Sequence, residues 1–561
     1  MDCEEQVYSE EHYDFIVEHM RAVSENIFTE CVQRIDEQYD VFYQESEGLL
    51  PLSVENYSYQ AIPKCFVLMD KQALESSGIL RMQDYPTLML RGQGVMLGFV
   101  DTGIDYSHPA FLNSDGTSRI VAIWDQTERS GDPPEGFLYG SEYRQKRINE
   151  ALRSQNPREI VPTTDSEGHG TFLAGIAAGS ENAEADFIGA APYSYIAVVR
   201  LKEAKQYLRE FFYIPKGVAA YQENDIMAGI SYLNKLAISM GVPLVLCLGL
   251  GTNTGSHGGV ASPLAGYLNT IGLRPQRTVV LAAGNEGNQR HHFAGMVSEG
   301  EAYQNVEVNV GENVEGFTVE LWARAPELFA VEIVSPTGQR MPREYILSGG
   351  REYDFLLENT RVSVDYRISG LGSGDQLIYM RFTHPVQGIW NIRVFSQVGY
   401  TGIYNMWLPV TEMISGEVYF IRSNPDMTIT VPANIIVPIT AAAYDMRDNS
   451  IYINSGRGYT LSGFIKPDLA APGVTVYGPK VGGGFETRSG TSVAAAITAG
   501  ASALLMEWAA VRGNYTTIST TGLKNILLRG TDQDPYREYP NREWGYGRLN
   551  LYKAFQNFRQ R

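Results

Sequence analysis

Positive charge and cysteine are both scarce in this sequence. Lys and Arg total 45 against 64 Asp and Glu, which gives a formal net charge of -19 at pH 7. Because this charge repels nucleic acid and anionic lipid, neither is expected as a partner. The four cysteines, Cys3, Cys31, Cys65 and Cys247, form no C-x-x-C pair. That spacing argues against a zinc site or a disulfide framework, so four reduced thiols are expected.

Long apolar runs are also missing. No run approaches the roughly 20 residues of a membrane-spanning helix, so no membrane insertion is expected. The first residues, MDCEEQVYSEEHYD, are acidic, whereas a secretory signal begins basic and continues apolar. This predicts a cytoplasmic protein. Otherwise the composition is that of a globular protein, with 44% hydrophobic and 19% charged residues, and the 561 residues leave room for about two or three domains.

The hydrophobic pattern divides the chain into three units. In residues 63–290 and again in 426–561, apolar runs such as VMLGFVD and PLVLCLGLG alternate with helical patterns, which predicts an α/β domain with a doubly wound parallel sheet. Residues 291–425 hold short alternating runs such as NVEVNVG and FTVELWARA, which predict an inserted all-β sandwich. Residues 1–62 predict a small α+β unit, with strands at YDFIVEH and YDVFY and a helix around NIFTECVQRIDEQ.

Asp101 follows one of the apolar runs, in VMLGFVDTGID, and three interpretations compete for it. An aspartic protease needs two Asp-Thr-Gly loops that share a proton. This sequence has one, with Ile104 where that class usually has a hydroxyl, so only dimerisation would complete the pair. A Ser-His-Asp triad needs instead a histidine and a serine elsewhere in the chain. The third interpretation is the polar end of a buried strand.

Candidate partners for Asp101 occur in two glycine-rich motifs. His169 lies between glycines in DSEGHGTFLAGIAAG, and Ser492 opens a small-residue helix in ETRSGTSVAAAITAG. A helix N-terminus favours negative charge that develops beside an attacked carbonyl. Each motif alone is more often a turn or a helix cap. Asn285, in VVLAAGNEGN, adds an amide that could donate to an oxyanion, and KPDLAAPGV precedes the serine motif.

Taken in order, DTGID, HGT, AAGN, APGV and GTSVAA resemble the subtilisin-like serine proteases, over about 94–290 and 428–555. The resemblance implies that Ser492 is the nucleophile and His169 the general base and then acid. It implies that Asp101 orients the histidine and that Asn285 donates to the oxyanion.

The same resemblance implies a substrate cleft. Gly249, Leu250 and Gly251 would form one wall of the S1 pocket, with Ala283 and Gly284 opposite, and a protein or peptide substrate would pair there as an added strand. No cofactor is implied. The loop SENAEADFIG differs from the calcium loop of secreted subtilisins, so no metal is expected there.

Two further features bear on regulation and metal binding. The adjacent His291 and His292 are expected in a surface turn rather than at a metal, because neighbouring side chains diverge.

The inserted sandwich makes the sequence similar to the clostridial germination-specific, or Csp, subtilisin-like proteases. This implies that residues 1–62 are a prodomain that occupies the cleft in cis, with Gln60 as a candidate P1 residue for self-cleavage.

Active members of the Csp group cleave the zymogen of a spore-cortex hydrolase, and such a protein could be packaged in the spore. Other members have lost triad residues and act in germinant sensing. This chain keeps all three residues, which favours activity. The alternatives are a catalytically silent sensor or scaffold, and a carbohydrate-binding role for the sandwich.

Overall fold

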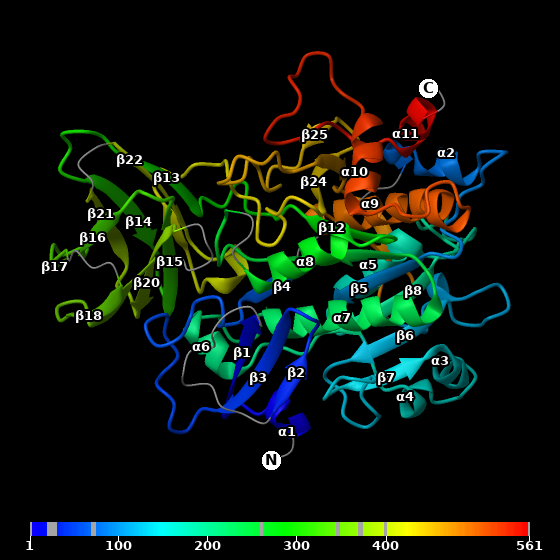
Figure 1. Cartoon of the computed structure of the whole chain (residues 1–561), viewed down its shortest axis with the longest axis horizontal. Helices are drawn as coiled ribbons and strands as arrows, with labels where there is room; N and C mark the ends of the chain where they lie inside the picture. The colour runs from blue at the N-terminus through cyan, green and yellow to red at the C-terminus, as the bar shows by residue number, and fades with distance from the viewer. Residues whose placement is uncertain are drawn as a thin grey trace.

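The computed structural model describes residues 3–18, 31–68, 75–258, 262–343, 348–368, 374–397 and 401–558. Figure 1 shows a large α/β unit, an all-β unit at its left side, and a small N-terminal sheet below the α/β helices. The predicted fold class is confirmed. It combines a subtilisin-like α/β sheet, an inserted β-sandwich and a small N-terminal unit.

The α/β unit is built on one large sheet with the order β25-β24-β12-β10-β5-β8-β6-β7, and β26 also pairs with β24. Pairing is parallel from β6 to β26, and only the edge strands β7 and β25 are antiparallel. Every residue of β5, β10 and β12 is buried, as expected of strands covered on both faces. The strands are β5 (Met96–Asp101), β6 (Ile120–Asp125), β7 (Ser141–Arg144), β8 (Tyr195–Arg200), β10 (Leu244–Leu248), β12 (Arg277–Ala282), β24 (Ile439–Asp445), β25 (Ser450–Ile451) and β26 (Leu469–Pro472).

Helices cover both faces of this sheet. Leu97 and Phe99 of β5 share a core with α5, α9, α10 and α11, whereas Met96 and Val100 share a second core with α7 and α8. This alternation explains why nearly every position of β5 is apolar. The helices are α2 (Ile79–Gln83), α3 (Gln145–Leu152), α4 (Pro157–Ile160), α5 (His169–Ala178), α6 (Gln206–Phe211), α7 (Glu223–Met240), α8 (Pro263–Leu273), α9 (Thr491–Met506), α10 (Thr520–Arg529) and α11 (Leu551–Phe558).

One helical stretch among the described residues, Thr491–Val511, is long and apolar enough to cross a membrane. It comprises α9 and the helical segment Glu507–Val511 that follows. However, 89% of its apolar 18-residue part is buried inside the protein. The stretch is therefore the central core helix of the α/β unit.

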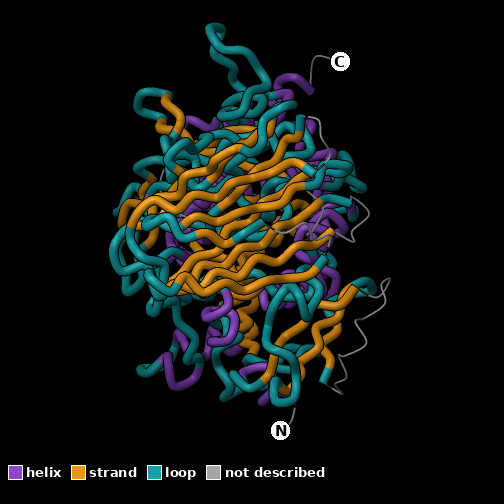
Figure 2. Tube along the Cα trace, turned by 90° about the vertical axis from the view of Figure 1, so that its left-hand side faces the viewer, coloured by secondary structure: helices purple, strands orange, loops and turns teal. Residues whose placement is uncertain are grey.

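The inserted unit is a sandwich of two antiparallel sheets, with orders β13-β22-β15-β20-β19-β18 and β17-β16-β21-β14-β23. Figure 2 shows its strands running across the face of the molecule. Side chains such as Val319, Phe382 and Trp390 fill the space between the sheets. The strands are β13 (His292–Val297), β14 (Gln304–Val310), β15 (Gly316–Ala323), β16 (Phe329–Val334), β17 (Arg340–Met341), β18 (Gly349–Phe355), β19 (Thr360–Ile368), β20 (Gln376–Thr383), β21 (Gly388–Ser396), β22 (Gly402–Trp407) and β23 (Val418–Phe420).

The N-terminal unit consists of α1 (Cys3–Tyr8) and a sheet of order β1-β3-β2, with β1 (His12–Glu18), β2 (Val32–Arg34) and β3 (Tyr39–Glu45). The two strands predicted at YDFIVEH and YDVFY are present. The helix expected around NIFTECVQRIDEQ begins outside the described residues, and its described part contains β2 instead. That segment pairs with β3, so the tertiary partner outweighs the local helical pattern.

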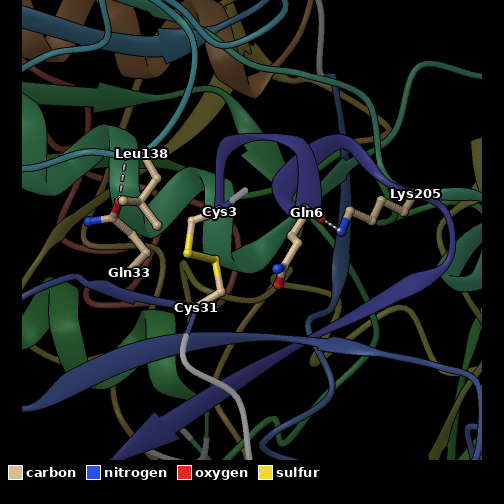
Figure 3. Close-up of a disulfide and its surroundings, with 6 residues drawn as sticks. All are labelled: Cys3, Gln6, Cys31, Gln33, Leu138 and Lys205. Carbon is tan, nitrogen blue, oxygen red and sulfur yellow. Dashed lines mark hydrogen bonds between the residues drawn. A yellow bond between two sulfur atoms is a disulfide. The ribbon is translucent and has the colours of Figure 1, made fainter. Parts of the chain in front are cut away.

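The cysteine prediction is wrong for one pair. Cys3 at the start of α1 and Cys31 just before β2 form a disulfide, which ties the helix to the sheet (Figure 3). The two cysteines are 28 residues apart and match no short cysteine motif, so the disulfide could not be predicted from their spacing. Cys65 and Cys247 are free and buried. Burial raises the pKa of both thiols, that of Cys65 to about 12, so both stay protonated and unreactive.

The N-terminal unit is anchored to the α/β unit by a buried carboxylate. Asp14 is 0% exposed, and its Oδ1 lies 2.6 Å from Nζ of Lys205. The side-chain amides of Gln222 and Asn224 donate to the other oxygen. Next to this contact, Lys205 also donates to the carbonyl of Gln6 (Figure 3). Removing one partner of this buried pair would leave an uncompensated charge, so the contact between the two units depends on both residues.

Candidate active site

The three predicted triad side chains lie together at the carboxyl edge of the parallel sheet. Asp101 ends β5, His169 begins α5, and Ser492 lies in the first turn of α9. Oδ1 of Asp101 lies 2.8 Å from Nδ1 of His169, and Nε2 of His169 lies 3.2 Å from Oγ of Ser492. All three residues are at most 1% exposed. They form a continuous, desolvated hydrogen-bonded chain.

The close approach of β5 and α5 depends on a glycine. A Cβ on Gly170 would lie 2.3 Å from the carbonyl oxygen of Gly103 and 3.2 Å from Cβ of Asp101. Instead, the Gly170 N–H donates to Oγ1 of Thr102, whose own N–H donates to Oδ1 of Asp101 at 2.8 Å. The glycine after His169 therefore lets the helix start lie directly on the carboxylate.

The sequence analysis missed the residue that fixes the start of α5. Asp165 is 1% exposed, and its carboxylate accepts from the N–H groups of Gly168 (2.8 Å) and Thr171 (2.8 Å) and from the Thr171 hydroxyl (2.6 Å). Thr171 Oγ1 also accepts from the N–H of Asp105. The helix bearing His169 is thus held to the loop after Asp101. An acidic residue shortly before a helix is a recognisable N-terminal signal.

Asn285 is held so that its amide nitrogen is left to donate. Its Oδ1 accepts from the N–H and the hydroxyl of Thr491, both at 3.2 Å. Thr491 Oγ1 in turn accepts from the N–H of Gly284 at 3.0 Å. Because Thr491 directly precedes Ser492, one residue joins the oxyanion candidate to the nucleophile. The Thr in the Gly-Thr-Ser motif has this role, which the sequence analysis did not assign.

The predicted pocket walls flank this arrangement. A Cβ on Gly249 would lie 2.9 Å from Cε1 of His169 and 3.0 Å from Cβ of Ser492. Leu250 and Gly251 form β11 (Leu250–Gly251) just beyond β10. Ala283 and Gly284 follow β12, and Gly284 has a φ of 100°, in the region that favours glycine.

A segment of the N-terminal region pairs with the predicted wall of the substrate cleft. The strand β4 (Cys65–Leu68) is the middle strand of a small sheet of order β11-β4-β9, with β9 (Tyr221–Gln222) on its other side. It runs antiparallel to β11, with Leu68 opposite Leu250 and Val67 opposite Gly251. The backbone edge that a peptide substrate would use is therefore already paired.

Gln60 lies in a turn upstream of β4. Its Oε1 accepts from the hydroxyl of Ser58 at 2.9 Å. Just after it, Lys64 is 2% exposed and donates to the carbonyls of Tyr59 and Ile62, and Glu223 at the start of α7 accepts from the Lys64 N–H at 3.3 Å. Cleavage after Gln60 stays a prediction.

The expectation for the two adjacent histidines is wrong in one respect. The side chains diverge, but both are buried, at 6% exposure for His291 and 0% for His292. His291 reaches the carboxylate of Glu286 at 2.7 Å, while His292 lies against Trp407 and contacts Asn405 in the sandwich. Desolvation lowers the pKa of His292 to about 4. Within the described ranges, no group of three His, Cys, Asp or Glu side chains could hold a metal ion.

A parallel sheet with a hydrogen-bonded Asp-His-Ser chain at its carboxyl edge is an arrangement typical of serine hydrolases. The chain belongs to the subtilase family, whose model matches residues 92–319 and 416–547.

Known proteins resemble the chain to different extents. The structure of the CspB protease of Clostridium perfringens is similar over 87% of this chain and 98% of that one, with 30% identity and a TM-score of 0.77. The subtilisin-like protease SBT2.2 of Arabidopsis thaliana is 32% identical over 126 residues, which are 19% of this chain and 15% of that protein. SBT3.1 of the same plant is 24% identical over 493 residues, 80% of this chain and 57% of that protein. The chain thus spans only part of the length of these curated relatives.

Proposed function

We propose that the chain is a serine endopeptidase that hydrolyses peptide bonds through an acyl-enzyme on Ser492. The observation that carries the proposal is the buried hydrogen-bonded chain from Asp101 through His169 to Ser492, with Asn285 beside it. A serine hydroxyl attacks a peptide carbonyl only when a base accepts its proton, and Nε2 of His169 lies at that distance.

The proposed reaction proceeds in two halves. The Ser492 oxygen attacks the carbonyl while His169 takes its proton, and Asp101 holds Nδ1–H and stabilises the imidazolium that forms. The oxyanion accepts from the Asn285 amide and the Ser492 N–H. His169 then returns the proton to the leaving amine, and water releases the acyl group by the same steps. No cofactor takes part in this scheme.

The proposal includes a blocked precursor form. The position of β4 between β11 and β9, and the 0% exposure of Ser492, support a role as an inhibitor in cis for an N-terminal unit that extends beyond the predicted residue 62, through β4 to Leu68. The buried contact of Asp14 with Lys205 joins that unit to the α/β unit.

We infer that the physiological substrate is a protein zymogen, namely a spore-cortex hydrolase precursor. The support is the resemblance to germination-type proteases, together with the similarity to the CspB protease over nearly all of that chain. The competing function is a silent sensor or scaffold in which the site never opens. The burial of all three triad residues is the observation that favours it.

The two functions predict different labelling by a fluorophosphonate probe, which reacts with an activated serine. Wild-type protein is expected to label and Ser492→Ala is not. Val67→Pro should label about tenfold faster than wild type, because proline removes an N–H from the middle strand of the sheet that blocks the cleft. The rates are followed by in-gel fluorescence against time.

Val67→Ala is the matched control for the proline variant, since it shortens the side chain but keeps the backbone donor. It should label at nearly the wild-type rate. Absence of labelling in a folded Val67→Pro protein would refute the peptidase and support the silent scaffold.

Processing can be located by N-terminal sequencing of purified protein. Pairing of β4 along β11 favours a cut on the C-terminal side of Leu68, so we expect the new N-terminus among residues 69–75. A terminus at Ala61 would instead uphold the prediction at Gln60. Ser492→Ala should keep its original terminus, and processing of that variant would assign the cut to another protease.

A further inference from the structure

Asn285 is followed at once by a buried carboxylate that the proposed reaction does not use. Glu286 is 3% exposed. Its Oε2 lies 2.7 Å from Nδ1 of His291, and its Oε1 accepts from the N–H (3.2 Å) and the hydroxyl (3.0 Å) of Thr411. The Asn253 amide also donates to Oε2 at 3.4 Å. Four hydrogen bonds therefore converge on one carboxylate beside the oxyanion candidate.

These partners come from three separate segments. His291 directly precedes β13, where the chain enters the sandwich, and Thr411 lies between β22 and β23. Asn253 lies just beyond Gly251 of the pocket wall, and its amide also donates to the carbonyl of Leu408 at 3.2 Å. Glu286 thus links the pocket wall to both the entry of the sandwich and the segment after β22.

The backbone around Glu286 is held as well. The N–H of Gln289 donates to the Glu286 carbonyl at 3.2 Å, and the N–H of Leu408 donates to the carbonyl of His291 at 2.9 Å. Asn285 itself is fixed on its other side through Thr491. If the carboxylate lost its partners, the chain from Asn285 to His291 would lose its side-chain links to Thr411 and Asn253, and Asn285 would be held less closely relative to the nucleophile.

A buried carboxylate on the residue that follows the oxyanion candidate also has an electrostatic consequence. An uncompensated carboxylate would oppose negative charge on the substrate oxygen. Here the donors from His291, Thr411 and Asn253 face both of its oxygens and reduce that effect. These donors therefore compensate the charge of the carboxylate. Their positions matter because small displacements of an oxyanion donor weaken transition-state stabilisation.

We propose that Glu286 is a positioning residue through which the inserted sandwich holds Asn285 in place to donate to the oxyanion. This inference rests on the proposed function, since it assigns Asn285 a part in that reaction. The sandwich is then a structural component of catalysis, and changes at its contact with Glu286 alter the chemical step rather than substrate binding.

The test is the steady-state kinetics of peptide hydrolysis in full-length protein carrying Val67→Pro, so that the cleft is open equally in all variants. Glu286→Gln keeps the size of the side chain but cannot accept at both oxygens. It should lower kcat about 30-fold with KM changed less than about twofold, because donation to the oxyanion is a transition-state interaction. Thr411→Val, which removes one donor from an exposed residue, should lower kcat about threefold.

A double-mutant cycle separates positioning from general damage. Asn285→Ala alone should cost about 10²-fold to 10³-fold in kcat, and adding Glu286→Gln should lower it no further. Multiplicative losses, or a rise in KM at unchanged kcat, would overturn the inference. Glu332→Gln is the matched control. Glu332 pairs with Arg393 at 2.7 Å across β16 and β21 of the sandwich, and its loss should leave kcat unchanged.

The inference and the proposed function fail in different ways. If the Val67→Pro protein with native Glu286 hydrolyses no peptide, the proposed function is wrong. If it hydrolyses peptide and Asn285→Ala lowers kcat while Glu286→Gln and Thr411→Val do not, only the positioning role is wrong. Thermal unfolding of each variant shows that the comparison is made on folded protein.

Discussion

His169→Ala is expected to lower kcat by about 10⁶-fold with the fold intact. The distance of 3.2 Å from Nε2 to the Ser492 oxygen makes this imidazole the base for the hydroxyl, which is itself fully buried. Without it, the Ser492 hydroxyl loses the base that accepts its proton. Peptide hydrolysis in the Val67→Pro background measures the loss, and thermal unfolding checks the fold.

A second histidine serves as control for this variant. His384 is exposed at a turn of the sandwich and has a φ of 47°, which asparagine tolerates. His384→Asn should therefore leave kcat near the wild-type value. If His169→Ala kept more than about a hundredth of the activity, another group would have to be the base.

The parts of the site that the sequence predicted are those with strong local patterns. Asp101 follows an uninterrupted apolar strand, His169 and Ser492 open helices, and Asn285 follows another apolar strand. In a parallel sheet all such positions meet at the carboxyl edge. Local pattern and topology placed these residues at one edge of the sheet, and the resemblance to the subtilisin-like proteases assigned their roles.

The parts that were missed depend on partners far away in the chain. Nothing near Cys3 indicates Cys31, and nothing near Leu68 indicates that it pairs with Leu250. Strand pairing depends on which edge is open and which faces are buried, and neither is a property of the segment itself.

The two histidines show a related limit. His291 and His292 follow a glycine-rich turn and look exposed, but His292 starts the first strand of the sandwich and His291 directly precedes it. Each is buried against a partner that only the folded insertion supplies, Glu286 in one case and Trp407 in the other. The sequence analysis correctly predicted that the two side chains point apart, but it could not identify the residues that bury them.

Asp101→Asn is expected to lower kcat by about 10⁴-fold, or about 5 kcal/mol in transition-state stabilisation. Oδ1 of Asp101 faces Nδ1 of His169 at 2.8 Å and also accepts from the Thr102 N–H. If the amide nitrogen of Asn faces the ring, the ring proton moves to Nε2 and the base is lost. If the amide oxygen stays, the imidazolium forms in a buried site without its compensating charge. Both arrangements raise the barrier while size and packing are kept.

The measurement is kcat and KM for peptide hydrolysis in the Val67→Pro background, with Asp125→Asn as the matched control. Asp125 is also fully buried at the carboxyl end of a strand of the same sheet, but its charge pairs with Arg200 at 3.0 Å. Both substitutions remove a buried carboxylate and should lower thermal stability. Only Asp101→Asn should remove the activity, because only Asp101 contacts His169. Nearly full activity of Asp101→Asn would mean that the imidazole is oriented by another group, and the role assigned to Asp101 would be wrong.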